Sequence, residues 1–223
     1  MTQVTRDLAF YTADTPNGQK VSIFLKEAGL AYEQFDLDLG KRDQHQPDFL
    51  KINPIGKIPA IVDRQTGLRI FESGAILSWL SSKTGCLLPT TEAENVAVQQ
   101  WLFFQVGSIG PMLGQLWWFL HGAKTVNDEA IARYQAQSLR LYQVVDTRLS
   151  ESAFLAGENY SIADIAAFTW LRTWDELRLN ITPYPHVKRW LHVIAARPAV
   201  QAGLHASKPT SRATRQRSTS SEE

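Results

Sequence analysis

The segment TPNGQK, residues 15–20, has the side chains of an anion site at the point where a strand pattern gives way to a helical one. LAFY before it is typical of a strand, and VSIFLKEAG after it has helical periodicity. Backbone N–H groups converge at such a junction, and the helix end favours negative charge. Thr15 and Asn17 add a hydroxyl and an amide, but the segment has no Cys, Ser, Tyr or His. A neutral amide takes no proton, so Asn17 would stabilise and orient a reactant rather than act as a base. The alternative is a plain helix start, with proline in the first turn and asparagine as the cap.

Two other segments carry residues suited to binding. FESGAIL places Glu72 and Ser73 at the start of a helical pattern, and NPIGKIPAIVD has Pro59 at the opening of an apolar strand. The residue before that proline, Ile58, must be extended. The alternatives are ordinary helix capping for the first segment and an edge-strand proline for the second.

The elements that must position these segments follow from two alternating periodicities over the first eighty-odd residues. Helices are predicted at 17–28 and 73–84, with a short helical turn broken by Pro54. Strands are predicted at 8–11, 31–39, 59–63 and 68–72. The order is βαβ followed by ββα, which predicts a small mixed sheet with helices packed on it.

Helical periodicity dominates after CLLPTT. A long helix is expected from Glu92 to about His121, bent by its glycines and by Pro111, and another from Asn127 to Ser152. Ser161 and Asp164 are spaced as a capping pair before an apolar run, and PYPHVKRWLHVIAARP supplies a last amphipathic helix. The chain from residue 205 onward has almost no apolar residues and is expected to be disordered.

In this order the motifs resemble the thioredoxin-like domain and following all-helical domain of glutathione transferases, over roughly residues 6–204. TPNGQKVSIFLKEAGLAY, DLGKRDQ, KIPAIVD, FESGAIL, QWLFFQVGSIGPMLGQ, IARYQ and GENYSIADIA look like the nu-class and yeast Ure2-like branch. Bacterial members of that branch act as glutathione-dependent disulfide-bond oxidoreductases. The resemblance implies an α/β thioredoxin-like domain with a mixed sheet at 6–86, an all-α domain at 92–204, and a disordered tail at 205–223.

The resemblance also implies how glutathione is held. A cis peptide at Pro59 would turn the N–H and C=O of Ile58 toward an open edge, where an extended tripeptide pairs like a short strand. Glu72 would accept from the γ-glutamyl ammonium. The Ser73 hydroxyl and the helix N-terminal N–H groups would receive the γ-glutamyl carboxylate.

Further binding residues are implied with alternatives left open. Gln44 would reach the peptide backbone or glycyl end, or else be a solvated loop glutamine. Lys57 would reach the glycyl carboxylate, or else be a surface lysine. Arg133 would contact glutathione from the helical domain, and the alternative is a surface pair with Glu129. Candidates for lining a second-ligand pocket are Trp117 and Trp118, and the alternative for both is a place in the core or in a dimer contact.

Glutathione brings its own thiol, so the chain needs no nucleophile. Asn17 and Thr15 would donate to the sulfur at the helix N-terminus. One such hydrogen bond together with the helix end would lower the thiol pKa by roughly one to two pH units. The thiolate would attack a disulfide, and a second glutathione would complete the exchange. The expected enzyme is therefore a glutathione-dependent disulfide-bond oxidoreductase without a catalytic cysteine. The alternatives are a transferase that conjugates electrophiles, or a non-catalytic glutathione-binding regulatory protein.

The bulk properties fit this expectation. The 223 residues carry a formal net charge of +1, which gives no reason to expect nucleic acid as a partner. Cys86 is the single cysteine, so an internal disulfide and a CxxC pair are excluded, and a small buried residue is expected there. The resemblance implies glutathione as co-substrate, and the histidines lack metal-ligand spacing, so no metal is expected. The absence of a signal-peptide pattern or membrane span predicts a cytoplasmic location, and the family resemblance implies a homodimer.

Overall fold

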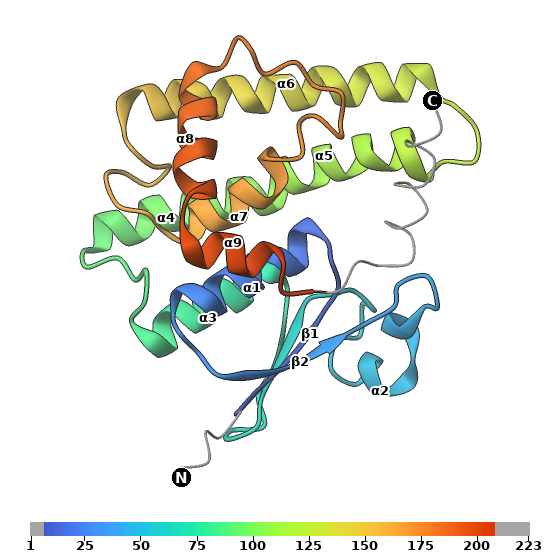
Figure 1. Ribbon diagram of the computed structural model, residues 1–223, viewed down its shortest axis with the longest axis vertical. Coiled ribbons are helices and arrows are strands. Elements are labelled where there is room, and N and C mark those ends of the chain that lie inside the picture. The colour runs from blue at the N-terminus through green and yellow to red at the C-terminus, as the bar shows by residue number, and fades with distance from the viewer. Residues whose placement is uncertain (1–6, 208–223) are drawn as a thin grey trace. The chain divides into compact units, whose positions relative to one another are not determined.

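The structure, a computed structural model, describes residues 7–207 and divides into two units (Figure 1). Of the described residues, the first unit contains 7–86 and 198–207, and the second contains Leu87–Arg197. The first unit has a mixed four-stranded sheet with helices, and the second is helical. The expected fold class is therefore confirmed.

The sheet has the strand order β2-β1-β3-β4. β1 (Leu8–Thr12) runs parallel to β2 (Tyr32–Asp36) and antiparallel to β3 (Ala60–Asp63). The edge strand β4 (Arg69–Phe71) pairs antiparallel with β3. The single parallel pair is the one joined through a helix, as a βαβ unit requires.

Two helices of the first unit carry the N-termini singled out in the sequence. α1 (Pro16–Glu27) and α3 (Ser73–Thr84) pack against each other on one side of the sheet (Figure 1). The short turns η1 (Asp43–His45) and α2 (Pro47–Leu50) follow β2. Three residues separate β1 from α1 and one separates β4 from α3, so each helix starts close to the end of the strand before it.

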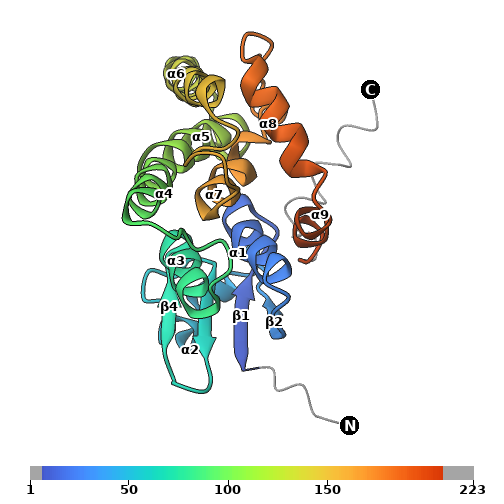
Figure 2. The ribbon, with the colours of Figure 1, turned by 90° about the vertical axis from the view of Figure 1, so that its left-hand side faces the viewer.

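The last described helix, α9 (Pro198–Leu204), packs on α1, as Figure 2 shows. The approach is close enough that a Cβ on Gly203 would lie 2.6 Å from Cα of Ile23. The expected helical domain ran to residue 204, whereas these contacts assign α9 to the first unit. Of the expected tail at 205–223, residues 208–223 lie outside the described part of the chain.

The helical unit begins with one continuous run over the predicted range. It consists of α4 (Glu92–Phe104), the π-helical turn η2 (Gln105–Ile109), α5 (Gly110–Trp117) and the π-helical turn η3 (Trp118–Gly122). The glycines and proline therefore do not break the helix; one π-helical turn directly precedes Gly110 and Pro111. The remaining helices are α6 (Asp128–Glu151), α7 (Ile162–Leu171) and α8 (Pro185–Ala195).

Asp164 is the buried cap that the Ser161–Asp164 spacing predicts. Its Oδ2 accepts from the backbone N–H of Ser161 at 3.0 Å and from its hydroxyl at 2.8 Å. Its Oδ1 accepts from the backbone N–H of Leu155 at 2.9 Å and from Nε1 of Trp190 at 3.0 Å. Burial raises the pKa of Asp164, and these four donors act in the opposite direction. One carboxylate thus joins α7, the loop before it and α8.

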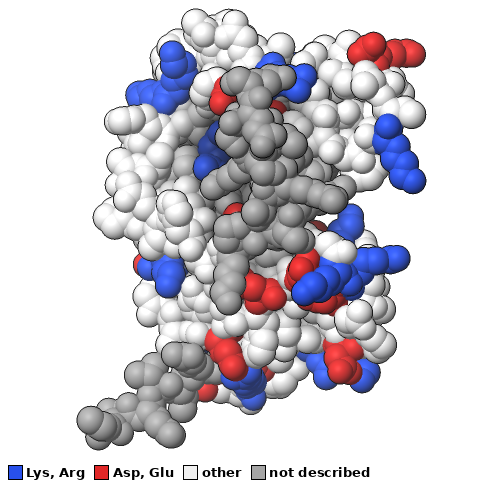
Figure 3. Space-filling model, turned by 45° about the vertical axis from the view of Figure 1, so that its right-hand side comes forward, with Lys and Arg blue, Asp and Glu red and all other residues white. Residues whose placement is uncertain are grey.

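The face in Figure 3 shows basic and acidic side chains interspersed, in keeping with the net charge of +1. Within residues 7–207, no helix is both long enough and apolar enough to cross a bilayer.

The Asp164→Ala variant should lose about 3 kcal/mol or more of unfolding free energy, because it leaves buried donors on three residues unsatisfied. Denaturant titration measures this loss. Glu94→Ala is the matched control, since Glu94 closes the equivalent capping box at the exposed start of α4. It should lose far less, and equal losses would show that the buried bonds to Leu155 and Trp190 contribute nothing.

Candidate functional site

The start of α1 presents Thr15 and Asn17 as the sequence predicts. Thr15 is the N-cap, and its Oγ1 accepts from the backbone N–H of Gly18 at 3.2 Å. Because that bond uses an oxygen lone pair, the hydroxyl proton of Thr15 is left for another acceptor. Asn17 follows as the second helical residue and is half-buried. Two polar groups thus flank the first turn of α1.

Gly18 explains how this turn lies so close to β1. A Cβ at this position would lie 2.3 Å from the carbonyl oxygen of Ala13 and 2.4 Å from Oγ1 of Thr12. Only glycine permits that approach. The segment TPNG therefore brings the start of α1 close to the end of β1, in addition to capping the helix.

The loop before β3 is built around a buried asparagine that the sequence reasoning did not single out. Asn53 is 2% exposed, donates from Nδ2 to the carbonyl of Lys57 at 2.6 Å, and accepts from the N–H of Ile55 at 3.1 Å. The Ile58–Pro59 bond is cis, as expected. β3 begins at Ala60, so the backbone of Ile58 stays outside the β1–β3 ladder.

Gln44 lies in η1, which contacts this loop. Gly56 has φ +62°, and a Cβ there would lie 2.6 Å from Nδ1 of His45 and 3.1 Å from the carbonyl oxygen of Gln44. The Oε1 atom of Gln44 is buried and accepts no hydrogen bond from any described residue. The structure therefore brings Gln44 next to the segment that carries Lys57, whose side chain is exposed, and Ile58.

Glu72 and Ser73 stand at the N-terminus of α3. Glu72 is the N-cap residue with φ +66° and ψ +115°, and its side chain is exposed. A left-handed φ at a residue other than glycine costs on the order of 1–3 kcal/mol and is found most often at functional sites. Ser73, the first helical residue, is buried at 8% exposure.

Lys20 is the site residue that the sequence reasoning missed. It is 2% exposed, and its Nζ donates to Oγ of Ser73 at 3.1 Å. Burial lowers the pKa of the Lys20 ammonium to about 7, while the Glu72 carboxylate acts to raise it. A signal was present: Lys20 precedes the buried Ile23 and Phe24 by three and four residues, which places it on the apolar face of α1.

The other predicted site residues belong to the helical unit. Arg133 is exposed on α6 and takes no part in the ion pairs found within residues 7–207, so the alternative pair with Glu129 is not formed. Trp117 donates from Nε1 to Oε1 of Glu176 at 2.6 Å, and Trp118 is 45% exposed. Their part in ligand binding stays a prediction.

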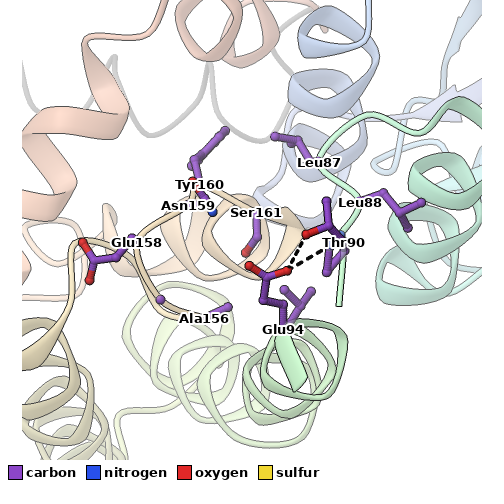
Figure 4. A pocket seen from close by; sticks show the side chains of 12 residues that line it. Leu87, Leu88, Thr90, Glu94, Ala156, Glu158, Asn159, Tyr160 and Ser161 are labelled. Carbon is purple, nitrogen blue, oxygen red and sulfur yellow. Dashed lines mark hydrogen bonds between the residues drawn. The ribbon is translucent and has the colours of Figure 1, made fainter. Parts of the chain in front are cut away.

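A cavity of about 410 Å³ lies in the helical unit, between residues 87–90, the start of α4 and residues 156–161 (Figure 4). Glu94, drawn at its wall, accepts from the hydroxyl and the N–H of Thr90. None of the predicted binding residues lines it. Among the described residues, no group of three or more His, Cys, Asp or Glu side chains could hold a metal ion.

The chain belongs to the glutathione S-transferase family. The family's N-terminal domain matches residues 7–82 and its C-terminal domain matches residues 109–198. The α/β unit with its cis proline and the helical unit are thus the two halves of that fold.

One curated relative and two solved structures show which members of the family the chain is similar to. The chain is 49% identical over 199 residues to the disulfide-bond oxidoreductase YfcG of Escherichia coli, covering 87% of this chain and 93% of that protein. A glutathione transferase of Pseudomonas putida, solved with one glutathione disulfide per subunit, is 40% identical with a TM-score of 0.86, covering 92% of this chain and 93% of that one. Ure2p in complex with glutathione is 31% identical with a TM-score of 0.84, covering 90% and 99%. The predicted branch is therefore confirmed.

Lys20 should make stability depend on pH. Its pKa is about 7 in the folded protein against 10.5 ordinarily, so the unfolded chain binds more protons between these values. The unfolding free energy therefore increases as the pH rises above about 7. Below about pH 7, the folded protein bears the full cost of burying the ammonium. Lys20→Met should therefore stabilise the protein by on the order of a few kcal/mol at about pH 6 and flatten this rise.

Denaturant titrations across this pH range measure the effect. Lys26→Met is the matched control, because Lys26 lies on the exposed face of the same helix. It should lose less than about 1 kcal/mol, because only the exposed contact of its ammonium with the Tyr32 ring is removed, and it should leave the pH dependence unchanged. A Lys20→Met variant that is less stable than the parent at low pH would show that the ammonium supports the fold.

Proposed function

We propose that this chain is a glutathione-dependent disulfide-bond oxidoreductase that stabilises a bound glutathione thiolate without a catalytic cysteine. The observation that carries the proposal is the start of α1. Thr15 and Asn17 lie at this helix N-terminus, and α1 contains no cysteine. Cys86 follows the C-terminal end of α3, a helix of 12 residues that begins at Ser73. The length of that helix separates its two ends by about 18 Å.

The reaction consists of two thiol–disulfide exchanges. Bound glutathione loses its thiol proton, and its thiolate attacks one sulfur of the substrate disulfide, so that a mixed disulfide forms and one substrate thiolate leaves. The thiolate of a second glutathione attacks the glutathione sulfur of the mixed disulfide. Glutathione disulfide forms and the second substrate thiolate leaves. The electrons come from the two glutathiones, so the protein itself stays unchanged.

The binding groups serve the parts of glutathione in turn. The backbone of Ile58, before the cis bond to Pro59, pairs with the extended peptide, and the unsatisfied Oε1 of Gln44 suits a peptide N–H. Glu72 accepts from the γ-glutamyl ammonium and Ser73 receives the γ-glutamyl carboxylate. Lys57 is assigned to the glycyl carboxylate, and Arg133 contacts glutathione from the helical unit. Trp117 and Trp118 are assigned to the second ligand.

A cytoplasmic homodimer completes the proposal. Val96, Phe103 and Val106 are 52%, 69% and 36% exposed, and their spacing of seven and three residues places them on one face of α4 and η2. A row of exposed apolar side chains on a helix is typical of a protein–protein contact. The single cysteine suits a reducing compartment, where glutathione is available.

Asn17→Ala should lower glutathione-driven reduction of a small model disulfide by roughly ten- to a hundredfold, because it removes one hydrogen bond to the thiolate. The apparent pKa of the bound thiol, read from the pH dependence of the rate, should rise by about one unit or more. Cys86→Ala is the control and should keep the parent rate. Activity that survives Asn17→Ala and collapses with Cys86→Ala would overturn the proposed mechanism. Glutathione binding and turnover of electrophiles without disulfide reduction would make conjugation the function.

Phe103→Glu should dissociate the proposed dimer, because a carboxylate would be buried in an apolar contact. Sedimentation velocity at several concentrations measures the mass in solution. Val126→Glu is the matched control, since Val126 is 78% exposed in the loop before α6 and should leave the mass unchanged. A parent protein that sediments as a monomer would contradict the dimer without touching the proposed chemistry.

A further inference from the structure

The buried ammonium of Lys20 lies behind the hydroxyl that is proposed to receive the γ-glutamyl carboxylate. Lys20 is in the second turn of α1, and its Nζ donates to Oγ of Ser73 at 3.1 Å across to the first residue of α3. Taking a lysine side chain almost wholly out of water is costly, and proteins do so mostly where the charge is used. The proposed reaction gives this group no role, since it takes place at the sulfur beside Thr15 and Asn17.

The direction of the hydrogen bond decides what Ser73 offers to a ligand. An ammonium only donates, so the contact occupies a lone pair of Oγ and leaves the hydroxyl proton to point elsewhere. A neutral amine has a lone pair of its own and can accept that proton. Ser73 would then turn its oxygen lone pairs toward the ligand, and these repel a carboxylate.

We propose that Lys20 is a positioning residue of the glutathione site: its ammonium holds Ser73 as a hydrogen-bond donor to the α-carboxylate of the γ-glutamyl group and adds positive charge behind it. This inference rests on the proposed function, because it deepens the recognition of glutathione at the same site. On this inference, the free α-carboxylate contributes more than the rest of the peptide to ligand specificity at the ends of α1 and α3.

The helices packed on α1 present few titratable groups among the described residues, and a bound carboxylate would add one beside Lys20. α3 contributes Glu72 at its start, which favours the ammonium, and Lys83 near its end, which is paired with Asp63 at 2.8 Å. α9, which also packs on α1, has no titratable side chain. The pKa of Lys20 is about 7 in the free protein, so the ammonium is only partly populated at neutral pH. An arriving carboxylate raises this pKa, and binding therefore takes up a proton.

The sulfur acts in the opposite direction, because a thiol that becomes a thiolate releases a proton on binding. S-Methylglutathione removes that contribution, since its sulfur does not ionise. With this ligand, the affinity of the parent protein should fall as the pH rises above about 7, by at most tenfold per pH unit. Calorimetry in buffers of different ionisation enthalpy should show a fraction of a proton taken up per ligand at neutral pH. This measurement needs no variant.

A double-mutant cycle tests whether Lys20 acts through Ser73. Lys20→Met and Ser73→Ala should each weaken binding of S-methylglutathione by roughly ten- to a hundredfold at about pH 6. The double variant should bind little worse than either single one, because both remove the same interaction. Lys26→Met is the control on the exposed face of α1 and should bind like the parent.

A second ligand locates the effect. The 4-aminobutyryl analogue of S-methylglutathione lacks the α-carboxylate and keeps the ammonium. It should bind the parent and Lys20→Met with equal affinity and without proton uptake. Equal weakening of both ligands by Lys20→Met, or no weakening of either, would overturn the role of Lys20 and leave the proposed function standing. A parent protein that binds no S-methylglutathione would overturn the glutathione site itself and this inference with it.

Discussion

The hydrogen bond from Lys20 to Ser73 is the interaction on which the proposed anion site of the first unit depends. It joins α1 to α3 near their N-termini, where each helix presents free N–H groups and a partial positive charge. A buried ammonium between two such ends is unfavourable on its own, since all three are positive. The arrangement becomes favourable when an anion arrives, and glutathione carries carboxylates as well as the thiolate. In the proposed site, binding of an anionic peptide would offset this local cost.

Gly18 and Asn53 fix the distances between the segments of the candidate site. Gly18 lets the first turn of α1 approach the end of β1, and a methyl group there would collide with backbone and side-chain oxygen at under 2.5 Å. Asn53 holds the loop that leads into the cis bond by bonding to both of its sides. Neither residue is among the proposed ligand contacts. Both fix distances between the segments that carry the proposed contacts, and the chemistry of the helix ends is useful only at those distances.

The sequence was sufficient for the elements and for much of the site, and insufficient where tertiary contacts decide. Periodicity located each strand of the sheet and the long helices, and the Ser161–Asp164 spacing gave a cap that the structure confirms. It did not show that Asp164 also bonds Leu155 and Trp190, because those partners are nine and 26 residues away. Lys20 was overlooked since a lysine in a helix is ordinarily exposed, and only its phase relative to Phe24 argues otherwise. The bonding of Trp117 to Glu176 depends on a partner 59 residues distant, which no local pattern encodes.

The place of α9 has a consequence for how the protein is made. Gly203 lies against Ile23, so the last described helix covers part of a helix that precedes the whole helical unit in the sequence. The first unit is therefore complete only after the helical unit, which lies between its two parts in the sequence, has been synthesised. Until then the apolar surface of α1 beneath α9 is open to water or to other proteins. The helical unit, Leu87–Arg197, is one uninterrupted stretch, so all of its segments are synthesised before α9.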